Sequence, residues 1–154
     1  PDVMTLAKAL GNGVPIGALL AKDAVASHFK PGDHGSTFGG NPLVCAAAFA
    51  TVQAIEDENI LANVNEMGNY FKEKLVAFKE KYDFILDVRG KGLLLGMELA
   101  MKGADIVAKC MEKGVIINCT HDTVLRFLPP LNVSTAEIDK AVAVMDEVFQ
   151  TIEA

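Results

Sequence analysis

The sequence lacks the features that would direct a protein to a membrane, to nucleic acid or to export. No apolar run reaches the ~20 residues that a membrane-spanning helix requires, and the N-terminus lacks the charged-then-apolar pattern of a signal peptide. Lysine and arginine are scattered through a chain whose net charge is -6, so no patch is predicted to bind a phosphate backbone. We therefore expect a cytoplasmic protein whose partners include neither a membrane nor a nucleic acid.

Cysteine and histidine are scarce and show no pattern typical of a metal site. The chain has three of each, Cys45, Cys110 and Cys119, and His28, His34 and His121. The cysteines lie in apolar surroundings, where cysteine behaves as a small hydrophobic residue. The histidines have no mutual spacing that suggests metal ligation. We predict no metal site and assign no catalytic role to histidine.

The length and composition suit one compact core. A chain of 154 residues with 51% hydrophobic content can bury a core of ordinary domain size. It opens with Pro1 and Asp2 instead of methionine and enters an apolar segment within two residues. This beginning leaves no room for a normal domain start, so we expect a fragment of a longer protein.

The first forty residues are rich in glycine and turn signals, and loops are expected to dominate there. A short buried strand is predicted over about Gly17 to Ala21, and a short helix over Lys22 to Phe29. The signal sharpens at Asn41-Pro42, because asparagine is a good N-cap and proline suits the first helical position. A helix is therefore predicted from about Pro42 to Asp57.

From Asn59 onward the expected order is helix, two strands, helix, two strands, helix. The periodicity of apolar residues predicts helices from after Asn59 to about Lys81, over Ala104 to Lys113, and after the capping box Ser134-Thr135-Ala136-Glu137. The predicted strands are Phe84 to Val88, Gly92 to Leu99, Val115 to Cys119 and Thr123 to Leu128, the first two joined by a turn over Arg89-Gly90-Lys91-Gly92. This pattern indicates an α/β (α+β) fold, a small sheet covered by helices. We place one part at residues 1–58 and a second at 59–154.

Lys8 is unusual because it stands alone in the apolar run Val3 to Leu10. Burial would disfavour the charged form of its amine and lower its pKa, which is the condition for imine formation with an aldehyde. The alternative is an edge residue whose ammonium reaches water while its stem packs. The residue type by itself favours the second interpretation, because lysine is rarely fully buried.

Two further segments could bind anions. Ser36 and Thr37 stand with Gly39 and Gly40 just before the predicted helix start, where free N–H groups attract phosphate; an ordinary loop before a helix is the alternative. Arg126 alternates with Val124 and Leu128 on one face of a predicted strand. Its guanidinium could receive a substrate carboxylate or pair with a structural acidic residue.

Taken together and in this order, these segments resemble the class III, fold type I pyridoxal-phosphate (PLP) dependent aminotransferases. Asp2-Val3-Met4-Thr5-Leu6-Ala7-Lys8-Ala9-Leu10-Gly11-Asn12-Gly13-Val14-Pro15-Ile16-Gly17-Ala18 is similar to the cofactor-lysine segment of the acetylornithine group. His34-Gly35-Ser36-Thr37-Phe38-Gly39-Gly40-Asn41-Pro42-Leu43 resembles the block whose threonine contacts PLP phosphate across the dimer interface. Val88-Arg89-Gly90-Lys91-Gly92-Leu93-Leu94-Leu95-Gly96 resembles the entry to the small domain. Leu125-Arg126-Phe127-Leu128-Pro129-Pro130-Leu131 resembles the carboxylate-binding arginine strand.

The resemblance implies a role for each candidate residue. Lys8 would hold PLP, yield to the substrate amine and move a proton between the substrate α-carbon and the cofactor, whose ring is the electron sink. Thr37, with Ser36 beside it, would contact the phosphate, and Arg126 would bind the α-carboxylate of glutamate or 2-oxoglutarate. The implied reaction is N-acetylornithine plus 2-oxoglutarate giving N-acetylglutamate semialdehyde plus glutamate, in arginine biosynthesis, by a homodimer. Residues 1–58 would then be a C-terminal remnant of the large PLP-binding domain and 59–154 the small domain.

The chain departs from the family pattern upstream of Lys8. In the family, an aspartate that pairs with the pyridine nitrogen, an aromatic that stacks on the ring and a glycine-containing phosphate loop all precede the lysine, and here only seven residues do. We therefore expect the chain alone to be inactive or nearly so, and its uncovered apolar area to favour self-association. The alternatives are an aminotransferase acting on ornithine, succinylornithine or 4-aminobutyrate, and a non-catalytic interaction domain.

Overall fold

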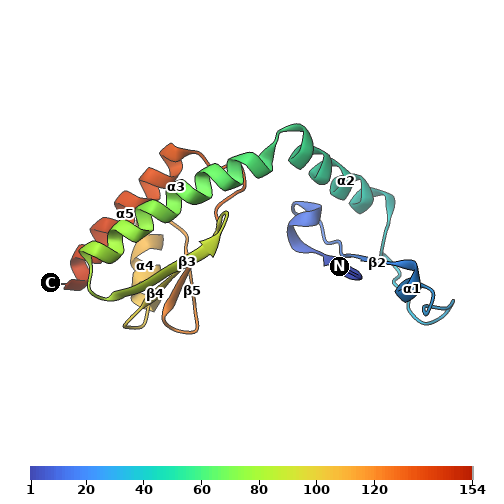
Figure 1. The fold of residues 1–154 in the computed structure, drawn as a ribbon, viewed down its shortest axis with the longest axis horizontal. Helices are drawn as coiled ribbons and strands as arrows, with labels where there is room; N and C mark the ends of the chain where they lie inside the picture. Colours follow the sequence, from blue (N-terminus) through green and yellow to red (C-terminus); the bar gives the residue numbers. More distant parts are fainter. Residues whose placement is uncertain (154) are drawn as a thin grey trace. The chain divides into compact units, whose positions relative to one another are not determined.

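The computed structural model describes residues 1–153, which form two compact units, Pro1–Asn59 and a second that begins at Ile60. The first unit contains strands β1 (Val3–Leu6) and β2 (Ala18–Ala21), a 3-10 helix η1 (Lys8–Gly11), the one-turn helix α1 (Asp23–Ala26) and helix α2 (Pro42–Asp57). The second contains helices α3 (Ile60–Lys81), α4 (Ala104–Glu112) and α5 (Thr135–Glu153), with strands β3 (Ile85–Lys91), β4 (Leu94–Leu99), β5 (Asn118–Thr120) and β6 (Val124–Phe127). Both units are drawn in Figure 1.

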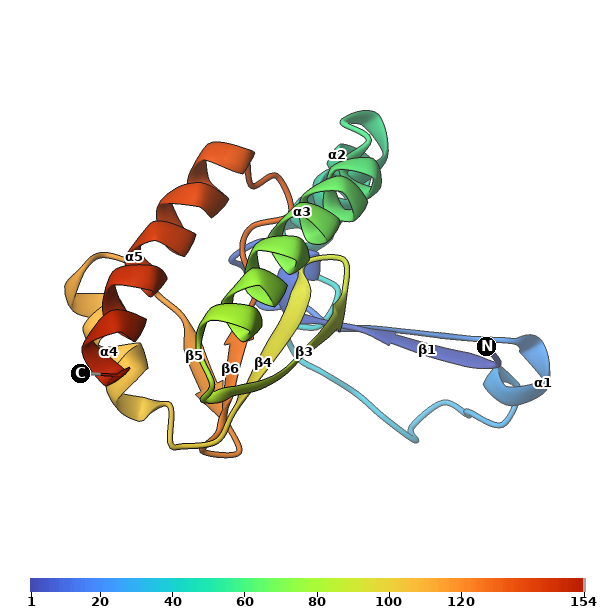
Figure 2. The same cartoon turned by 60° about the vertical axis from the view of Figure 1, so that its left-hand side comes forward.

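The second unit is a four-stranded antiparallel sheet with helices on one face. The strand order is β3-β4-β6-β5, and α3 and α5 lie side by side across the sheet (Figures 1 and 2). Alternate residues of the two central strands point into the core, as the period of two requires. The core combines them with apolar residues of all three helices, including Leu95, Met97, Leu125, Phe127, Phe71, Leu75, Ile106, Cys110, Met145 and Phe149. The predicted small sheet covered by helices is confirmed.

The two N-terminal helix caps that the sequence predicted, at Asn41 and at Ser134, are found in the structure. The side chain of Asn41 accepts a hydrogen bond from the Val44 N–H at the start of α2. At the start of α5, Glu137 accepts from the Ser134 N–H at 2.8 Å, and the Glu137 N–H donates to Ser134 Oγ at 3.4 Å. These reciprocal bonds satisfy N–H groups that a helix start leaves without a partner. The Ser134 hydroxyl also donates to the Glu137 carboxylate at 2.7 Å, and this bond, followed by that from the Ser134 N–H, lowers the pKa of Glu137 below its ordinary value.

The hairpin turn between β3 and β4 does not lie where the sequence predicted it. Arg89 and Gly90 continue β3, Lys91 pairs with Leu94, and the turn itself is Gly92-Leu93. Gly92 has a φ of +54°, and Leu93 is buried. The two glycines of the sequence suggested a turn over Arg89 to Gly92. In the structure Leu93 is buried and the turn has two residues, so Arg89 belongs to the sheet.

The predicted strand over Val115 to Cys119 begins three residues later, at Asn118. The reason is the end of α4, where the Gly114 N–H donates to the Met111 carbonyl and the Val115 N–H to the Cys110 carbonyl. Gly114 has a φ of +82°, as expected for the left-handed residue that ends a helix. The amide of Val115 is therefore used by the helix end and cannot join a sheet.

The first unit contains a strand that the sequence did not predict. β1 pairs antiparallel with β2, from Val3 opposite Ala21 to Leu6 opposite Ala18. All four residues of β1 are exposed, and Leu19 in β2 is 58% exposed. The burial expected for the strand over Gly17 to Ala21 is therefore not found among the described residues. The predicted helix over Lys22 to Phe29 shortens to the single turn of α1.

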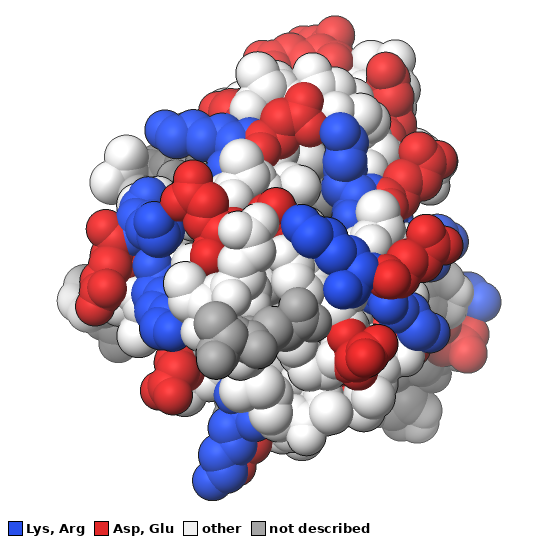
Figure 3. Space-filling view, turned by 90° about the vertical axis from the view of Figure 1, so that its left-hand side faces the viewer, with Lys and Arg blue, Asp and Glu red and all other residues white. Residues whose placement is uncertain are grey.

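Charges of both signs are interspersed over the face of the molecule shown in Figure 3, so this face presents no wide area of one sign. Among residues 1–153, no helix combines the length and the apolarity that crossing a membrane requires. The same residues contain no group of three or more histidine, cysteine or acidic side chains that could hold a metal ion.

Candidate active site

Lys8 occupies a strained position at the start of η1, directly after β1. Its φ is +53°, a left-handed backbone conformation that is uncommon for any residue with a side chain. Such outliers cost about 1–3 kcal/mol each and gather at functional sites. The Lys8 side chain is exposed, as in the interpretation of an edge residue that the residue type favoured, and it is not buried among the apolar residues around it. Among residues 1–153, the other non-glycine residues with a positive φ are Asn12, Asn59, His121 and Asp122, all of types that adopt this conformation more readily, so Lys8 is the exception among them.

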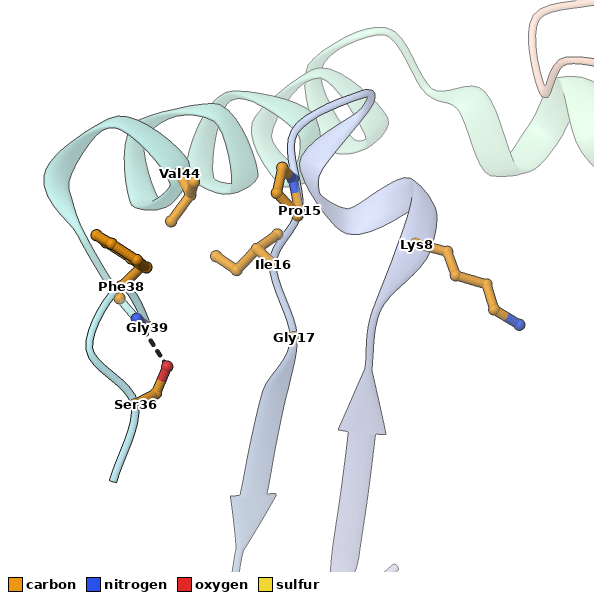
Figure 4. A pocket seen from close by; sticks show the side chains of 9 residues that line it. Lys8, Pro15, Ile16, Gly17, Ser36, Phe38, Gly39 and Val44 are labelled. Atoms are coloured by element: carbon orange, nitrogen blue, oxygen red, sulfur yellow. Dashed lines mark hydrogen bonds between the residues drawn. The ribbon is translucent and has the colours of Figure 1, made fainter. Parts of the chain in front are cut away.

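Lys8 and Ser36 line one cavity of about 660 Å³ within the first unit. Pro15, Ile16 and Gly17 border it from the segment before β2, and Val44 borders it from the first turn of α2. The labelled side chains in Figure 4 show Ile16, Phe38 and Val44 on one side, while the Lys8 side chain extends away from Ser36. Lys8 and Ser36 therefore border one cavity whose walls are otherwise mainly apolar, and the amine of Lys8 is directed away from the hydroxyl of Ser36.

The loop before α2 presents donors suited to an anion. Ser36 Oγ accepts from the Gly39 N–H at 3.0 Å, and a Cβ on Gly39 would lie 2.8 Å from Ser36 Oγ. Gly40 has a φ of +66°, and a Cβ built on it would meet nothing within 4 Å. The two glycines therefore permit a tight loop with open backbone directly before a helix start, where N–H groups attract negative charge.

The structure does not bring every predicted residue to this cavity. Thr37 is exposed and is not among the residues that line it, whereas its neighbour Ser36 is. Arg126 lies in the second unit, on β6. Leu125 and Phe127 on either side of it point into the core, so Arg126 faces the side of the sheet opposite the helices. Within residues 1–153, Arg126 forms no ion pair and is exposed, so the structural pairing weighed for it is not found.

Sequence reasoning missed a polar cluster on that same face of the sheet. Arg89 donates from Nη1 to Asp87 at 3.0 Å and from Nη2 to Glu98 at 2.7 Å. Thr123 donates to the other oxygen of Glu98 at 2.8 Å. The hydrogen bond from Arg89, and then that from Thr123, lowers the pKa of Glu98 below its ordinary value. Alternation along β3 could have revealed the cluster if Arg89 had been read as part of a strand.

The chain matches the family model described as aminotransferase class III over residues 1–149. Among curated proteins, it is 56% identical over 153 residues to an acetylornithine aminotransferase of Methanocaldococcus jannaschii, covering 99% of this chain and 38% of that protein. It is 53% identical to an acetylornithine aminotransferase of Aquifex aeolicus, covering 97% of this chain and 38% of that protein. The chain thus spans well under half the length of these relatives.

Solved structures of the same family share the fold of this chain. A crystal structure of acetylornithine aminotransferase from Elizabethkingia anophelis superposes with a TM-score of 0.90 at 34% identity, covering 98% of this chain and 41% of that one. Ornithine delta-aminotransferase from Plasmodium falciparum gives a TM-score of 0.92 at 34% identity, covering 98% of this chain and 39% of that one. By the family match over nearly its whole length and by these relatives, the chain belongs to the class III aminotransferases.

Proposed function

We propose that this chain is the C-terminal part of a PLP-dependent acetylornithine aminotransferase and carries its cofactor lysine. The reaction is N-acetylornithine plus 2-oxoglutarate giving N-acetylglutamate semialdehyde plus glutamate, a step of arginine biosynthesis in the cytoplasm. Residues 1–58 belong to the large PLP-binding domain and residues 59–154 form the small domain. The observation that carries the proposal is the strained Lys8 beside the same cavity as Ser36 and the glycines that precede α2.

The residues around the cavity fit an aldehyde that carries a phosphate. Lys8, which carries an amine, and Ser36, which carries a hydroxyl, both border the cavity, with the Lys8 side chain extending away from Ser36 (Figure 4). Gly40 leaves its backbone uncovered just before the N-terminus of α2, which suits a phosphate. The cavity of about 660 Å³ lies within the range of roughly 300–1,000 Å³ that is usual for small-molecule sites.

The chemistry divides between the cofactor and this chain. When bound, PLP supplies the electron sink for the bonds at the substrate α-carbon. Lys8 would hold the cofactor through Nζ and, once released from it, would carry a proton at Nζ to and from the substrate α-carbon. The exclusion of water from Lys8 falls to residues outside this chain, because Lys8 is exposed among the described residues.

Two other residues complete the assignment. Arg126, exposed and without an ion pair within residues 1–153, binds the α-carboxylate of glutamate or 2-oxoglutarate through two parallel hydrogen bonds. Thr37 contacts the cofactor phosphate of a neighbouring subunit in a homodimer. Its place outside the cavity that Lys8 and Ser36 line supports this division between subunits.

An adduct experiment tests the role of Lys8 without requiring activity. The chain is mixed with stoichiometric PLP and reduced with borohydride, and the labelled lysines are mapped by peptide mass spectrometry. We expect the pyridoxyl adduct mainly at Lys8 and its loss in Lys8→Ala. The matched control is Lys22→Ala, an exposed lysine of the same unit that pairs with Asp2 at 2.9 Å. Equal labelling of many lysines, unchanged in Lys8→Ala, would contradict the assignment.

Ornithine aminotransferase is the second candidate. Solved ornithine aminotransferases superpose with TM-scores of 0.92, but their identity to this chain is 34–35%, against 47–56% for the five leading curated acetylornithine relatives. The solved acetylornithine aminotransferase is itself 34% identical to this chain, so identity to solved structures does not separate the two activities. The assignment is supported by the names of these five curated relatives, all of which are acetylornithine aminotransferases. A panel of amino donors offered to the full-length enzyme, comprising N-acetylornithine, ornithine, succinylornithine and 4-aminobutyrate, distinguishes these candidates.

A further inference from the structure

Both arginines of the sequence lie on the same face of the sheet, on either side of one glycine. Gly96 in β4 is opposite Arg89 in β3 and opposite Arg126 in β6. Residues directly opposite each other in antiparallel strands share a face, and this is the face opposite the helices. Neighbouring strands are about 4.8 Å apart, so the backbones of the two arginines are roughly 10 Å apart with Gly96 between them.

Gly96 is not required by the local structure. It is absent from the glycines with a positive φ, and a Cβ built on it would lie no closer than 3.4 Å to the nearest side chain, that of Val124. A glycine inside a strand is unfavourable and often marks a position that a ligand approaches closely. The sheet is therefore open between the two arginines.

One carboxylate is within reach of both arginines. Glu98 is two residues along β4 from Gly96 and on the same face, so it is a diagonal neighbour of both Arg89 and Arg126. Diagonal neighbours are ~7–8 Å apart, within reach of long side chains. In the structure Glu98 contacts Arg89 with one oxygen and Thr123 with the other. Each oxygen of Glu98 thus has a hydrogen-bond partner, and within the described chain Arg126 has no acidic partner.

We infer that Arg89 is a positioning residue, which holds Glu98 away from Arg126 and so keeps Arg126 available for a substrate carboxylate. This inference rests on the proposed function, in which Arg126 binds that carboxylate. When Arg89 is removed, Glu98 becomes a tethered competitor of the substrate. An exposed ion pair is worth about 0.2–1 kcal/mol, so pairing with Glu98 reduces the free fraction of Arg126 about 2- to 6-fold.

A purely structural role for Arg89 makes a different prediction. Asp87 lies directly opposite Glu98, and like charges in that position are unfavourable. Arg89 contacts both carboxylates and offsets their repulsion. If this were its only role, removing Arg89 would lower stability and leave the surroundings of Arg126 unchanged. The availability of Arg126 therefore separates the two roles.

The test measures how fast phenylglyoxal, a reagent selective for guanidinium groups, modifies Arg126 at low ionic strength. Peptide mass mapping follows each arginine separately, and far-UV circular dichroism verifies that every variant is folded. We expect Arg89→Gln to slow modification of Arg126 about 2- to 6-fold. Adding Glu98→Gln to that variant restores the parent rate, and Arg89→Lys preserves most of it. Lys91→Gln is the matched control, because it removes a cation of β3 that forms no ion pair within residues 1–153.

An unchanged rate at Arg126 in folded Arg89→Gln would overturn the inference. If Arg89→Gln does not fold, the single variant Glu98→Gln is measured instead. Because Glu98 is the competitor, its substitution should leave Arg126 at least as reactive as in the parent. A slower modification of Arg126 in Glu98→Gln would overturn the inference. The side-chain Nε–Hε signals give a second measurement, since the chain has just these two arginines. Neither result depends on the adduct at Lys8, which belongs to the other unit, so failure of one proposal is distinguishable from failure of the other.

Discussion

Replacing Gly68 with alanine should destabilise the second unit, although alanine is the better helix former. Gly68 is buried in α3 where the helix meets the β3–β4 turn. A Cβ at this position would lie 2.4 Å from the carbonyl oxygen and 2.5 Å from the carbonyl carbon of Gly92. Ordinary van der Waals contact begins near 3.4 Å, so the helix and the turn must separate by about 1 Å (3.4 − 2.4).

The magnitude follows from two opposing effects. Alanine in a helix interior stabilises the helix by about 1 kcal/mol relative to glycine. Overpacking typically costs about 1–3 kcal/mol and occasionally more. The upper part of that range applies here, because the atoms that the methyl group meets belong to the backbone of Gly92 and cannot rotate away. The net expectation is a loss of about 2 kcal/mol in the free energy of unfolding.

Urea unfolding followed by far-UV circular dichroism measures this loss. With a denaturant slope of roughly 1–3 kcal/mol/M for a small protein, the midpoint should fall by about 1 M. The control is Asn69→Ala, the next residue of α3, which is exposed and should change stability by no more than about 0.5 kcal/mol. If Gly68→Ala instead stabilised the chain by its helix propensity, the close approach of helix and turn would be refuted.

Two further predictions concern polar contacts of the second unit. Tyr82→Phe keeps the buried ring but removes the hydroxyl, which lies 2.8 Å from the carboxylate and 3.3 Å from the carbonyl of Asp146. The free energy of unfolding in urea should fall by about 1–2 kcal/mol, and an unchanged midpoint would contradict this. Because Ser134 lowers the folded-state pKa of Glu137, the stability from its ionised form is complete above the unfolded value of about 4.3 and is lost as the pH falls through the folded value. Glu137→Gln keeps a side-chain oxygen at the cap but does not titrate. As the pH falls from 7 to 3 the parent should therefore lose more stability than the variant, and a constant difference between the two would count against the assignment.

Signals that depend on local chemistry could be read from the sequence. The caps at Asn41 and Ser134 need only a side-chain oxygen near free N–H groups of the same helix, and both are found. The apolar periodicity of α3 and α5 likewise depends on one element at a time. These features specify the helices of the second unit and the start of α2 without knowledge of the rest of the molecule.

Features that depend on long-range contacts could not be read in the same way. Arg89 was placed in a turn because two glycines follow it closely in the sequence. The structure places the turn at Gly92 and Leu93, where the Leu93 side chain is buried, and Arg89 lies in β3. For Lys8 the sequence left both burial and exposure open, because an apolar run is buried only where another layer packs on it. The pairing of β1 with β2 joins residues up to eighteen positions apart, and a segment of four residues, three of them apolar, carries too little alternation to predict a strand.

The contrast in burial between the two units limits what an unfolding experiment can report. Among the described residues, Val44 is the one buried large hydrophobic residue of the first unit, whereas the rest of the apolar core lies in the second. Heat capacity changes and denaturant slopes arise from surface exposed on unfolding. The heat capacity change and the denaturant slope of the whole chain therefore arise mainly from the second unit. Substitutions near Lys8 can alter cofactor binding while leaving both quantities unchanged, so stability screens of this chain are silent about the residue proposed to carry its chemistry.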